Sequence, residues 1–343
     1  MKKTSFVLRR TVLALIASSV GASFSATAQQ TTVASKASAS SKVQPWPTTI
    51  IKLVVGFPAG SVQDISARIL AEPLSKSLGQ PVIVENKPGA SGSIAAAYVA
   101  KATDGHTFGV MNNSQLTIAK ILNPNAAYDP AKDLSPIALI ATAPMVFVVS
   151  NTVAGTTPNQ WILSLRDQGT KANYGTPGLG TPGHLGMEMI KAKSGIAMTH
   201  VPYAGNPQVI TAMLSGQIQA ALLPTGLALQ QIKAGKMFAI GVTAEQRNVL
   251  APDLPTLRES GIAGADIELF SAVAGPSSTP KFVQDKLGTA VVDAVKAAET
   301  RQRLITSGWQ PAPSVAEGLR KKIIVENGRM GGIIIMRNIR AES

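Results

Sequence analysis

The chain has 343 residues, a formal net charge of +13 and no cysteine. The lack of cysteine excludes disulfides, a lipid-modified cysteine anchor, thiol catalysis and thiolate metal sites. Nucleic-acid binding is not expected either, because no basic cluster is interleaved with aromatic residues, which make up only 4% of the chain.

Residues 1–28 have the pattern of a secretory signal peptide. Four basic residues within the first ten positions precede an apolar run over residues 11–24, and an Ala-Thr-Ala sequence ends at Ala28. A membrane anchor is the alternative, but the run is shorter than the roughly 20 apolar residues that a bilayer span needs. The Arg9-Arg10 pair leaves both twin-arginine and general secretory export open. We therefore expect cleavage after Ala28 and a periplasmic protein.

Residues 29–45 are rich in Ser, Thr, Ala and Lys, and we predict a disordered leader there. From residue 48 onward, apolar runs of strand length alternate with helical patterns. In the first series, the predicted strands are 49–57, 81–86 and 107–112, and the predicted helices end at Gly79, Lys101 and residue 122. Pro73 should kink or restart the first of these helices.

A long strand over 136–149 leads into a second series of the same kind. Strands are predicted over 172–175, 198–203, 218–223 and 237–243, with helices over 182–193 and up to Gly216 and Gly235. A further strand over 267–275 is followed by mostly helix to the end of the chain.

Strands that alternate with helices and are apolar throughout indicate parallel sheets buried on both faces. Two such series predict two Rossmann-like α/β lobes joined by two crossover strands, near 143–150 and 267–274, with the C-terminal helices returning to the first lobe. The predicted division is a signal peptide (1–28), a leader (29–45), lobe 1 (46–147 and 270–343) and lobe 2 (148–269). Ligands of such sheets bind outside the carboxyl ends of the strands, which here face the cleft between the lobes.

The loop 175–184 contains Gly178, Gly180 and Gly183 in the G-x-G-x-x-G spacing of a dinucleotide-binding turn. Such a turn needs an acidic residue about 20 positions later, but none follows Glu188 until Glu245. A phosphate-binding P-loop is excluded as well, because Thr-Pro stands where Lys-Ser/Thr is required. The sequence therefore predicts neither a dinucleotide-binding turn nor a P-loop here.

The same loop can bind an anion through the helix that follows it. Thr181 is placed as the N-cap and Pro182 as the first helical residue. A helix N-terminus carries unpaired N–H donors and about half a positive charge, so it binds carboxylate without a basic side chain. Similar loops, uncharged apart from Lys87, follow five other predicted strands, at GFPAGS, KPGASGS, MNNS, YAGN and PTG. We expect these strand ends to converge on one site for a small anion.

For several charged or titratable residues, a structural role is the simpler interpretation. Asp64 is expected to cap its helix with Ser61, although a ligand contact is the alternative. Lys87 is expected to be a solvated loop charge. His184 could donate to a ligand, whereas His200, inside an apolar strand, is expected to be a satisfied core residue.

No catalytic or metal site is predicted. No two of the three histidines are spaced as a helical metal pair, and a G-x-S-x-G elbow is missing from the sequence. We therefore expect a binding protein without cofactor or metal; an exported hydrolase using His184 or Ser114 is a remote alternative.

Residues from Trp46 to about Arg340 resemble the tripartite tricarboxylate transporter substrate-binding proteins, also called the Bug family. The resemblance lies in the motifs IKLVVGFPAG with Asp64, LGQPVIVENKPGASG, DGHTFGVMNNS, YDPAKDLSPIALIATAPMVFVV, YGTPGLGTPGHLGMEM, HVPYAG, APDLPTLRESGI and GPSSTP. It implies a monomeric, two-lobed periplasmic binding protein of the type II class that holds a dicarboxylate, an amino acid or an aromatic acid through backbone amides and bridging waters.

The resemblance also implies partners and contacts. The partners would be the membrane permease subunits of a tripartite tricarboxylate transporter or, alternatively, a membrane signalling protein that reads the liganded receptor. This sequence departs from the family's pattern at two places that bear on the identity of the ligand. Ser61-Val62-Gln63 replaces a more glycine-rich segment, and Ala204 stands where the family often has lysine. The implied ligand contacts are Phe57, Pro58, Ala59, Gly60, Ser61, Ser91, Asn112, Asn113 and Ser114 in the first lobe, and Thr176, Gly180, Thr181, His184 and Tyr203 in the second.

Overall fold

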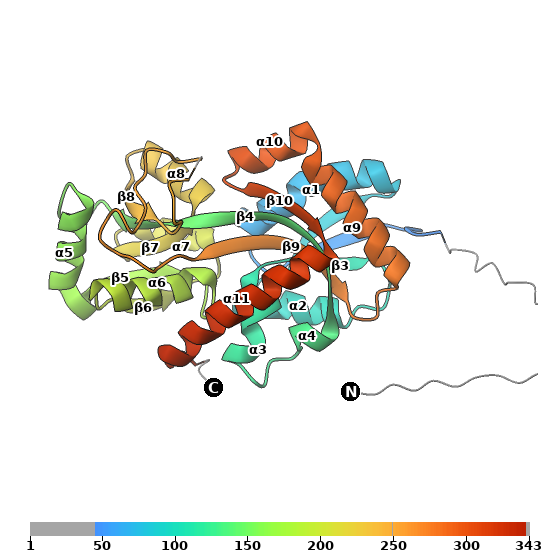
Figure 1. The fold of residues 1–343 in the computed structure, drawn as a ribbon, viewed down its shortest axis with the longest axis horizontal. Coiled ribbons are helices and arrows are strands. Elements are labelled where there is room, and N and C mark those ends of the chain that lie inside the picture. Colours follow the sequence, from blue (N-terminus) through green and yellow to red (C-terminus); the bar gives the residue numbers. More distant parts are fainter. Residues whose placement is uncertain (1–44, 249, 341–343) are drawn as a thin grey trace, which may run out of the picture. The chain divides into compact units, whose positions relative to one another are not determined.

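The computed structural model describes residues 45–248 and 250–340 (Figure 1). The predicted signal peptide and all of the predicted leader except its last residue lie outside the described residues. Within the described ranges, none of the helices combines the length and apolar character needed to cross a bilayer.

The first lobe is built on the strand order β2-β1-β3-β9-β4, in which β4 spans Leu134–Ser150. Strands β1 (Ile51–Val55), β2 (Val82–Asn86) and β3 (Thr107–Met111) run parallel, as predicted, and β9 (Glu268–Pro276) joins β3 antiparallel. The connecting helical segments are α1 (Val62–Leu78), η1 (Ala90–Gly92), α2 (Ser93–Ala100), the π-helical turn η2 (Ser114–Ile118), α3 (Ala119–Leu122) and α4 (Pro130–Asp133).

Helix α1 is continuous through Pro73, so the predicted restart of the helix does not occur. The helix ends at Gly79, whose φ of 71° is the left-handed conformation that glycine adopts without steric cost. Its N–H donates to the Ser75 carbonyl oxygen at 3.0 Å. The predicted glycine stop is therefore confirmed.

The second lobe continues from β4 in the order β4-β7-β5-β6, and β8 also pairs with β4. Strand β5 is parallel to β6 and β7, whereas β7 and β8 are antiparallel to β4. Helix α5 and the short turn η3 were not among the predicted elements. The elements are β5 (Asn173–Thr176), β6 (Thr199–Pro202), β7 (Ala220–Pro224), β8 (Met237–Val242), α5 (Pro158–Gln168), η3 (Gly169–Lys171), α6 (Pro182–Ser194), α7 (Asn206–Leu214) and α8 (Thr225–Lys233).

Strands β4 (Leu134–Ser150) and β9 connect the two lobes, as the sequence predicts (Figure 1). The first part of β4, up to Pro144, pairs antiparallel with β9, and the part from Met145 onward pairs with β7 and β8. One continuous strand therefore belongs to the sheets of both lobes. Strand β9 is antiparallel to β3 and β4, and β4 is antiparallel to β7 and β8, so the sheet of each lobe is mixed and not purely parallel.

The sheets are buried on both faces. Leu53 and Val55 of β1 belong to one apolar cluster and Val54 to another, on the opposite side of the pleat. Phe147 and Val146 of β4 divide in the same way between two clusters of the second lobe. This is the double-sided burial that the uninterrupted apolar strands predict.

The C-terminal segment consists of α9 (Lys281–Lys296), α10 (Ala298–Thr306), β10 (Gln310–Val315) and α11 (Ala316–Met336). Strand β10 corrects the expectation of helix throughout this region. It pairs antiparallel with β4, and its register shifts between Pro311 and Ser314. Prolines cannot donate to a ladder and are confined to edges and bulges, which is why its sequence did not suggest a strand.

Helices α9 and α10 pack against α1, as the predicted return to the first lobe requires. The two ends of helix α11 pack against different lobes. Leu319 belongs to a first-lobe cluster, whereas Met330, Ile333 and Ile334 belong to the cluster built around Phe147 of the second lobe. The unusually apolar C-terminal segment therefore covers the second core. The lobe boundaries at 147/148 and 269/270 stay a prediction.

Candidate ligand-binding cleft

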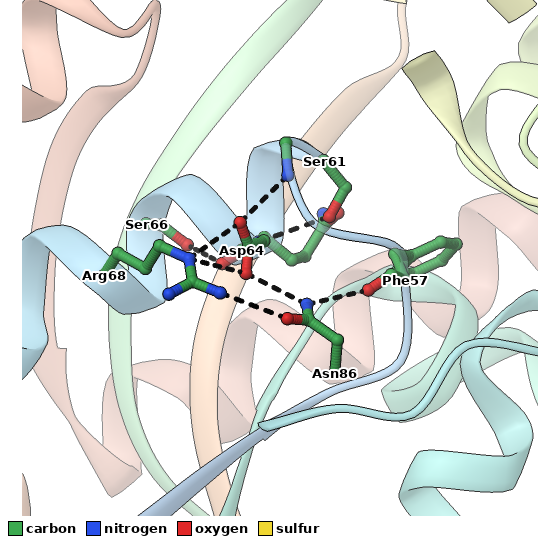
Figure 2. Close-up of polar contacts among 8 residues, drawn as sticks. Phe57, Ser61, Asp64, Ser66, Arg68 and Asn86 are labelled. Carbon is green, nitrogen blue, oxygen red and sulfur yellow. Dashed lines mark hydrogen bonds and ion pairs between the residues drawn. The ribbon is translucent and has the colours of Figure 1, made fainter. Parts of the chain in front are cut away.

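The loop between β1 and α1 is held by a network centred on Asp64 (Figure 2). The Asp64 carboxylate accepts hydrogen bonds from Gly60 N (2.9 Å), Asn86 Nδ2 (2.9 Å) and Arg68 Nε (3.0 Å). Asn86 Nδ2 also donates to the Phe57 carbonyl oxygen at 3.0 Å. The loop from Phe57 to Ser61 is thereby fastened to α1 and to the end of β2.

Burial alone would raise the pKa of the Asp64 carboxyl. The hydrogen bonds from Arg68, Gly60 and Asn86, together with the Arg68 charge, outweigh burial, so the pKa lies below its usual value. Asp64 N also donates to Ser61 Oγ at 3.3 Å, which makes Ser61 the N-cap of α1. The predicted N-cap is confirmed for Ser61, whereas the Asp64 carboxylate accepts from Gly60 N, the residue before the cap.

The second-lobe loop has the predicted helix start. Thr181 is the N-cap of α6, its Oγ1 accepts from His184 N at 3.4 Å, and Pro182 is the first helical residue. Gly178 and Gly180 have φ values of 124° and 72°, which residues with a side chain rarely adopt. The glycines of the G-x-G-x-x-G sequence therefore shape a tight strand-to-helix turn.

Between the lobes lies a cavity of about 20 Å³, here called the interlobe cavity. The first turns of three helices reach it: α1 through Val62 and Gln63, α6 through Pro182 and Gly183, and α7 through Asn206. First-turn N–H groups have no intrahelical acceptor, and the lining of this cavity includes residues from the positive ends of three helices. The complete lining is Phe57, Val62, Gln63, Asn112, Met145, Pro177, Thr181, Pro182, Gly183, Asn206, Pro224 and Leu269.

No charged side chain is among these lining residues. An anion in the cavity would therefore be held by backbone and amide donors. At about 20 Å³ the cavity has room for about one water molecule, so a larger ligand requires the lobes to separate.

A second, wider hollow of about 870 Å³, here called the outer groove, also runs between residues of both lobes. Ser91 and Ser114 line it from the first lobe, and Gly180 and His200 from the second. Most of its remaining lining is apolar, including Ile94, Ala97, Ile118, Ala119, Leu122, Ala126, Ala127, Leu179 and Pro202.

The structure thus divides the predicted contact residues into three groups. Phe57, Asn112 and Thr181 line the interlobe cavity, and Ser91, Ser114 and Gly180 line the outer groove. The others line neither: these are Pro58, Ala59, Gly60, Ser61, Asn113, Thr176, His184 and Tyr203.

The side chain of Asn113 is occupied by hydrogen bonds within the protein. Its Nδ2 donates to the Glu268 carbonyl oxygen (3.1 Å) and to Glu326 Oε2 (3.2 Å), and its Oδ1 accepts from Phe270 N (3.1 Å). The side chain therefore ties the start of η2 to β9 and α11. Tyr203 lines a separate surface hollow of about 350 Å³ together with Pro207 and Gln217.

The second-lobe loop between β5 and α6 is stabilised by contacts of Thr176, His184 and His200. Thr176 Oγ1 lies 2.7 Å from His200 Nε2, and His184 Nδ1 accepts from Gly180 N at 3.2 Å. The two imidazoles stack with ring centroids 4.2 Å apart, and His200 also stacks on Tyr174. His200 is hydrogen-bonded, as expected of a core residue, but it is only half-buried and borders the outer groove.

Both histidines are held neutral. Burial, with a smaller effect of the neighbouring His200, lowers the pKa of His184 to about 3. Burial likewise lowers the pKa of His200 to about 4, although Glu188 opposes the shift. The neutral His184 ring can accept the Gly180 N–H, which keeps the loop in its turn conformation.

Direct contacts join the lobes around the cleft. Ser91 Oγ donates to the Leu179 carbonyl oxygen at 2.7 Å. Arg337 at the end of α11 pairs with Glu188 of α6 at 3.3 Å. Pro58 lies so close to Gly205 that a Cβ on the glycine would come within 2.9 Å of Pro58 Cδ. The structure is therefore that of a closed pair of lobes.

Sequence reasoning missed two polar residues of the interlobe cavity, Gln63 and Asn206. Gln63 follows the cap of α1 and Asn206 opens α7. Gln63 lies two positions after the predicted loop GFPAGS and Asn206 is the last residue of the predicted loop YAGN, and this placement was the available signal.

The model of the family described as "Tripartite tricarboxylate transporter family receptor" matches residues 66–339. Among curated proteins, a UPF0065 protein of Bordetella pertussis is 33% identical over 299 residues, which cover 87% of this chain and 92% of that protein. Protein BugT of the same species is 27% identical over 291 residues, covering 84% and 89%.

Solved structures agree with these matches. The periplasmic binding protein BugD has a TM-score of 0.82 and 27% identity, over 87% of this chain and 100% of that one. R. palustris Rpa4515 with adipate has a TM-score of 0.81 and 29% identity, over 84% and 97%. MatC from Rhodopseudomonas palustris with bound malate has a TM-score of 0.78 and 27% identity, over 84% and 99%.

Proposed function

Because the chain belongs to the tripartite tricarboxylate transporter receptor family, we propose that it captures a small carboxylate between its lobes and delivers it to the membrane subunits of such a transporter. Receptors bind and release their ligands unchanged, so the chain is a binding protein and not an enzyme. We further propose that it works in the periplasm after removal of residues 1–28.

The observation that carries the proposal is the convergence of three helix starts on one cavity without a charged side chain. Helix N-termini favour a negatively charged group and offer it unpaired N–H donors. Two structural relatives with this fold were solved with adipate and malate, which are both dicarboxylates. Carboxylate capture is therefore the chemistry that the site and the relatives support together.

Access to the site requires movement of the lobes. A dicarboxylate is much larger than the roughly one water molecule that the closed cavity admits. We propose hinge opening about β4 and β9, the two strands that connect the lobes. The outer groove would then receive the apolar part of a longer acid, because its lining is largely apolar.

A thermal-shift screen of carboxylic acids tests the proposed function. A true ligand at a hundredfold excess over its Kd stabilises the folded state by about 2.7 kcal/mol and raises Tm. Adipate and malate should be included, with adipamide as an uncharged control of the same length as adipate. We expect at least one acid to raise Tm and adipamide to have no effect. If no acid raises Tm, the proposal is wrong.

A further inference from the structure

Two amide side chains in the interlobe cavity have no hydrogen-bond partner for their nitrogen. Gln63 Nε2 and Asn206 Nδ2 are both buried without an acceptor among residues 45–248 and 250–340. The exposed fractions of the two residues are only 2% and 4%. Buried side-chain donors almost always find a partner, so two unpaired donors in one cavity call for an explanation.

The two amides come from opposite sides of the cleft. Gln63 lies in the first turn of α1 in the first lobe, and Asn206 is the first residue of α7 in the second lobe. Both line the same small cavity, at the positive ends of their helices. A group that accepts hydrogen bonds from both would be contacted by the two lobes at once.

We propose that Gln63 and Asn206 form an amide clamp, in which one side chain from each lobe donates to the carboxylate of the bound ligand. This inference rests on the proposed function and assigns the ligand's charged group to these residues. A carboxylate suits the clamp because it offers two acceptor oxygens and carries no donor that would oppose the amides. Separation of the lobes admits the ligand, and closing on it brings both amides to its carboxylate, so the clamp couples binding to closure.

Charged variants of nearly the same shape test the clamp. Gln63→Glu and Asn206→Asp each replace a donor by a carboxylate that repels the ligand. The probes are adipate and malate, with Kd measured by titration calorimetry at pH 7.5 for whichever acid the wild type binds. We expect each variant to raise Kd about tenfold or more, and the double variant to raise it further.

Asn248→Asp is the matched control. Asn248 Nδ2 is also buried without a partner in the described part of the chain, but Asn248 does not line the interlobe cavity. We expect this variant to keep the wild-type Kd within about twofold. Circular dichroism should confirm that each variant is folded; if Gln63→Glu does not fold, Gln63→Leu takes its place and should also weaken binding.

The pH dependence of Kd distinguishes the clamp from a merely structural role of Gln63. At low pH the new carboxyl of Gln63→Glu gains a proton and can donate again, so its Kd relative to wild type should fall between pH 7.5 and pH 4.5. Unchanged Kd values in Gln63→Glu and Asn206→Asp would overturn the clamp and leave carboxylate binding intact. Tighter binding in these variants would likewise overturn the clamp alone, whereas binding of none of the screened acids by the wild type would overturn both proposals.

Discussion

At the scale of single residues, burial decides the charge of His184 and His200. The titratable and charged groups around the two imidazoles are Tyr174, Glu188, Lys191 and Arg337. A protonated imidazole would therefore be attracted by one carboxylate and repelled by two cations. The folded-state pKa values of about 3 and about 4 lie below the ordinary value of 6.5. The unfolded chain therefore takes up protons before the folded protein does.

This difference predicts how stability depends on pH. The histidine contribution is fully present above pH 6.5 and is lost as pH falls below it, at about 1.4 kcal/mol per pH unit for each histidine. Urea unfolding between pH 7.5 and pH 5 should show the decline. His184→Gln, whose amide oxygen can still accept from Gly180 N, should reduce the slope by about half. His106→Gln in the first lobe is the control, and an equal slope in both variants would contradict the prediction.

At the scale of elements, α11 connects the two lobes because its two ends pack against different lobes. Its beginning packs on the first lobe through Leu319, and its end packs on the second through Met330, Ile333 and Ile334. Arg337 then pairs with Glu188 of α6. The helix is therefore a third connection between the lobes, in addition to β4 and β9.

Two methionines on α11 offer a matched test of this packing. Met330 is fully buried, whereas Met336 is 78% exposed. Met330→Ala should lower the free energy of unfolding by about 2–5 kcal/mol, because it leaves a cavity in the second core. Met336→Ala should change it by no more than about 0.5 kcal/mol. Equal effects in chemical unfolding would show that the end of α11 does not pack as described.

At the scale of the whole molecule, closure brings the Phe57–Ser61 loop against the start of α7. Gly205 has a φ of −177°, an extended conformation open to any residue, so the second lobe itself does not require glycine there. A Cβ at this position would nevertheless come within 2.9 Å of Pro58 Cδ across the cleft. The shortest contact of that Cβ, with Pro58, therefore arises only when the lobes are closed, whereas its contact with Gln208 Oε1 at 3.3 Å lies within the second lobe.

Gly205→Ala should therefore hinder closure without unfolding either lobe. We expect weaker binding of the acid found in the thermal-shift screen, by about threefold to tenfold, and a larger radius of gyration in solution scattering. Gly328→Ala, where a Cβ would meet nothing within 4 Å, is the control and should leave both quantities unchanged. Wild-type binding by Gly205→Ala would argue against closure as drawn in the structure.

Much of the fold could be predicted because its signals are local. Apolar runs of strand length, Gly79 as a helix stop, and the caps at Ser61 and Thr181 depend on neighbours within a few residues, and the structure confirms them. Strand β10 was missed because its prolines oppose strand formation and only pairing with the distant β4 makes it a strand. The uncharged loops and the family resemblance also pointed to an anion site in the cleft.

Only the tertiary structure decided which residues share the cleft. Asn113 follows a strand end as Asn112 does, yet its side chain is occupied by long-range bonds to Phe270 and Glu326, and only Asn112 lines the cavity. Gln63 and Asn206 are far apart in the chain, and the closed lobes place them at one cavity. The sequence by itself thus determined the elements and their caps, because those depend on short-range interactions. The composition of the site depended on packing between segments that are distant in sequence, which no local pattern encodes.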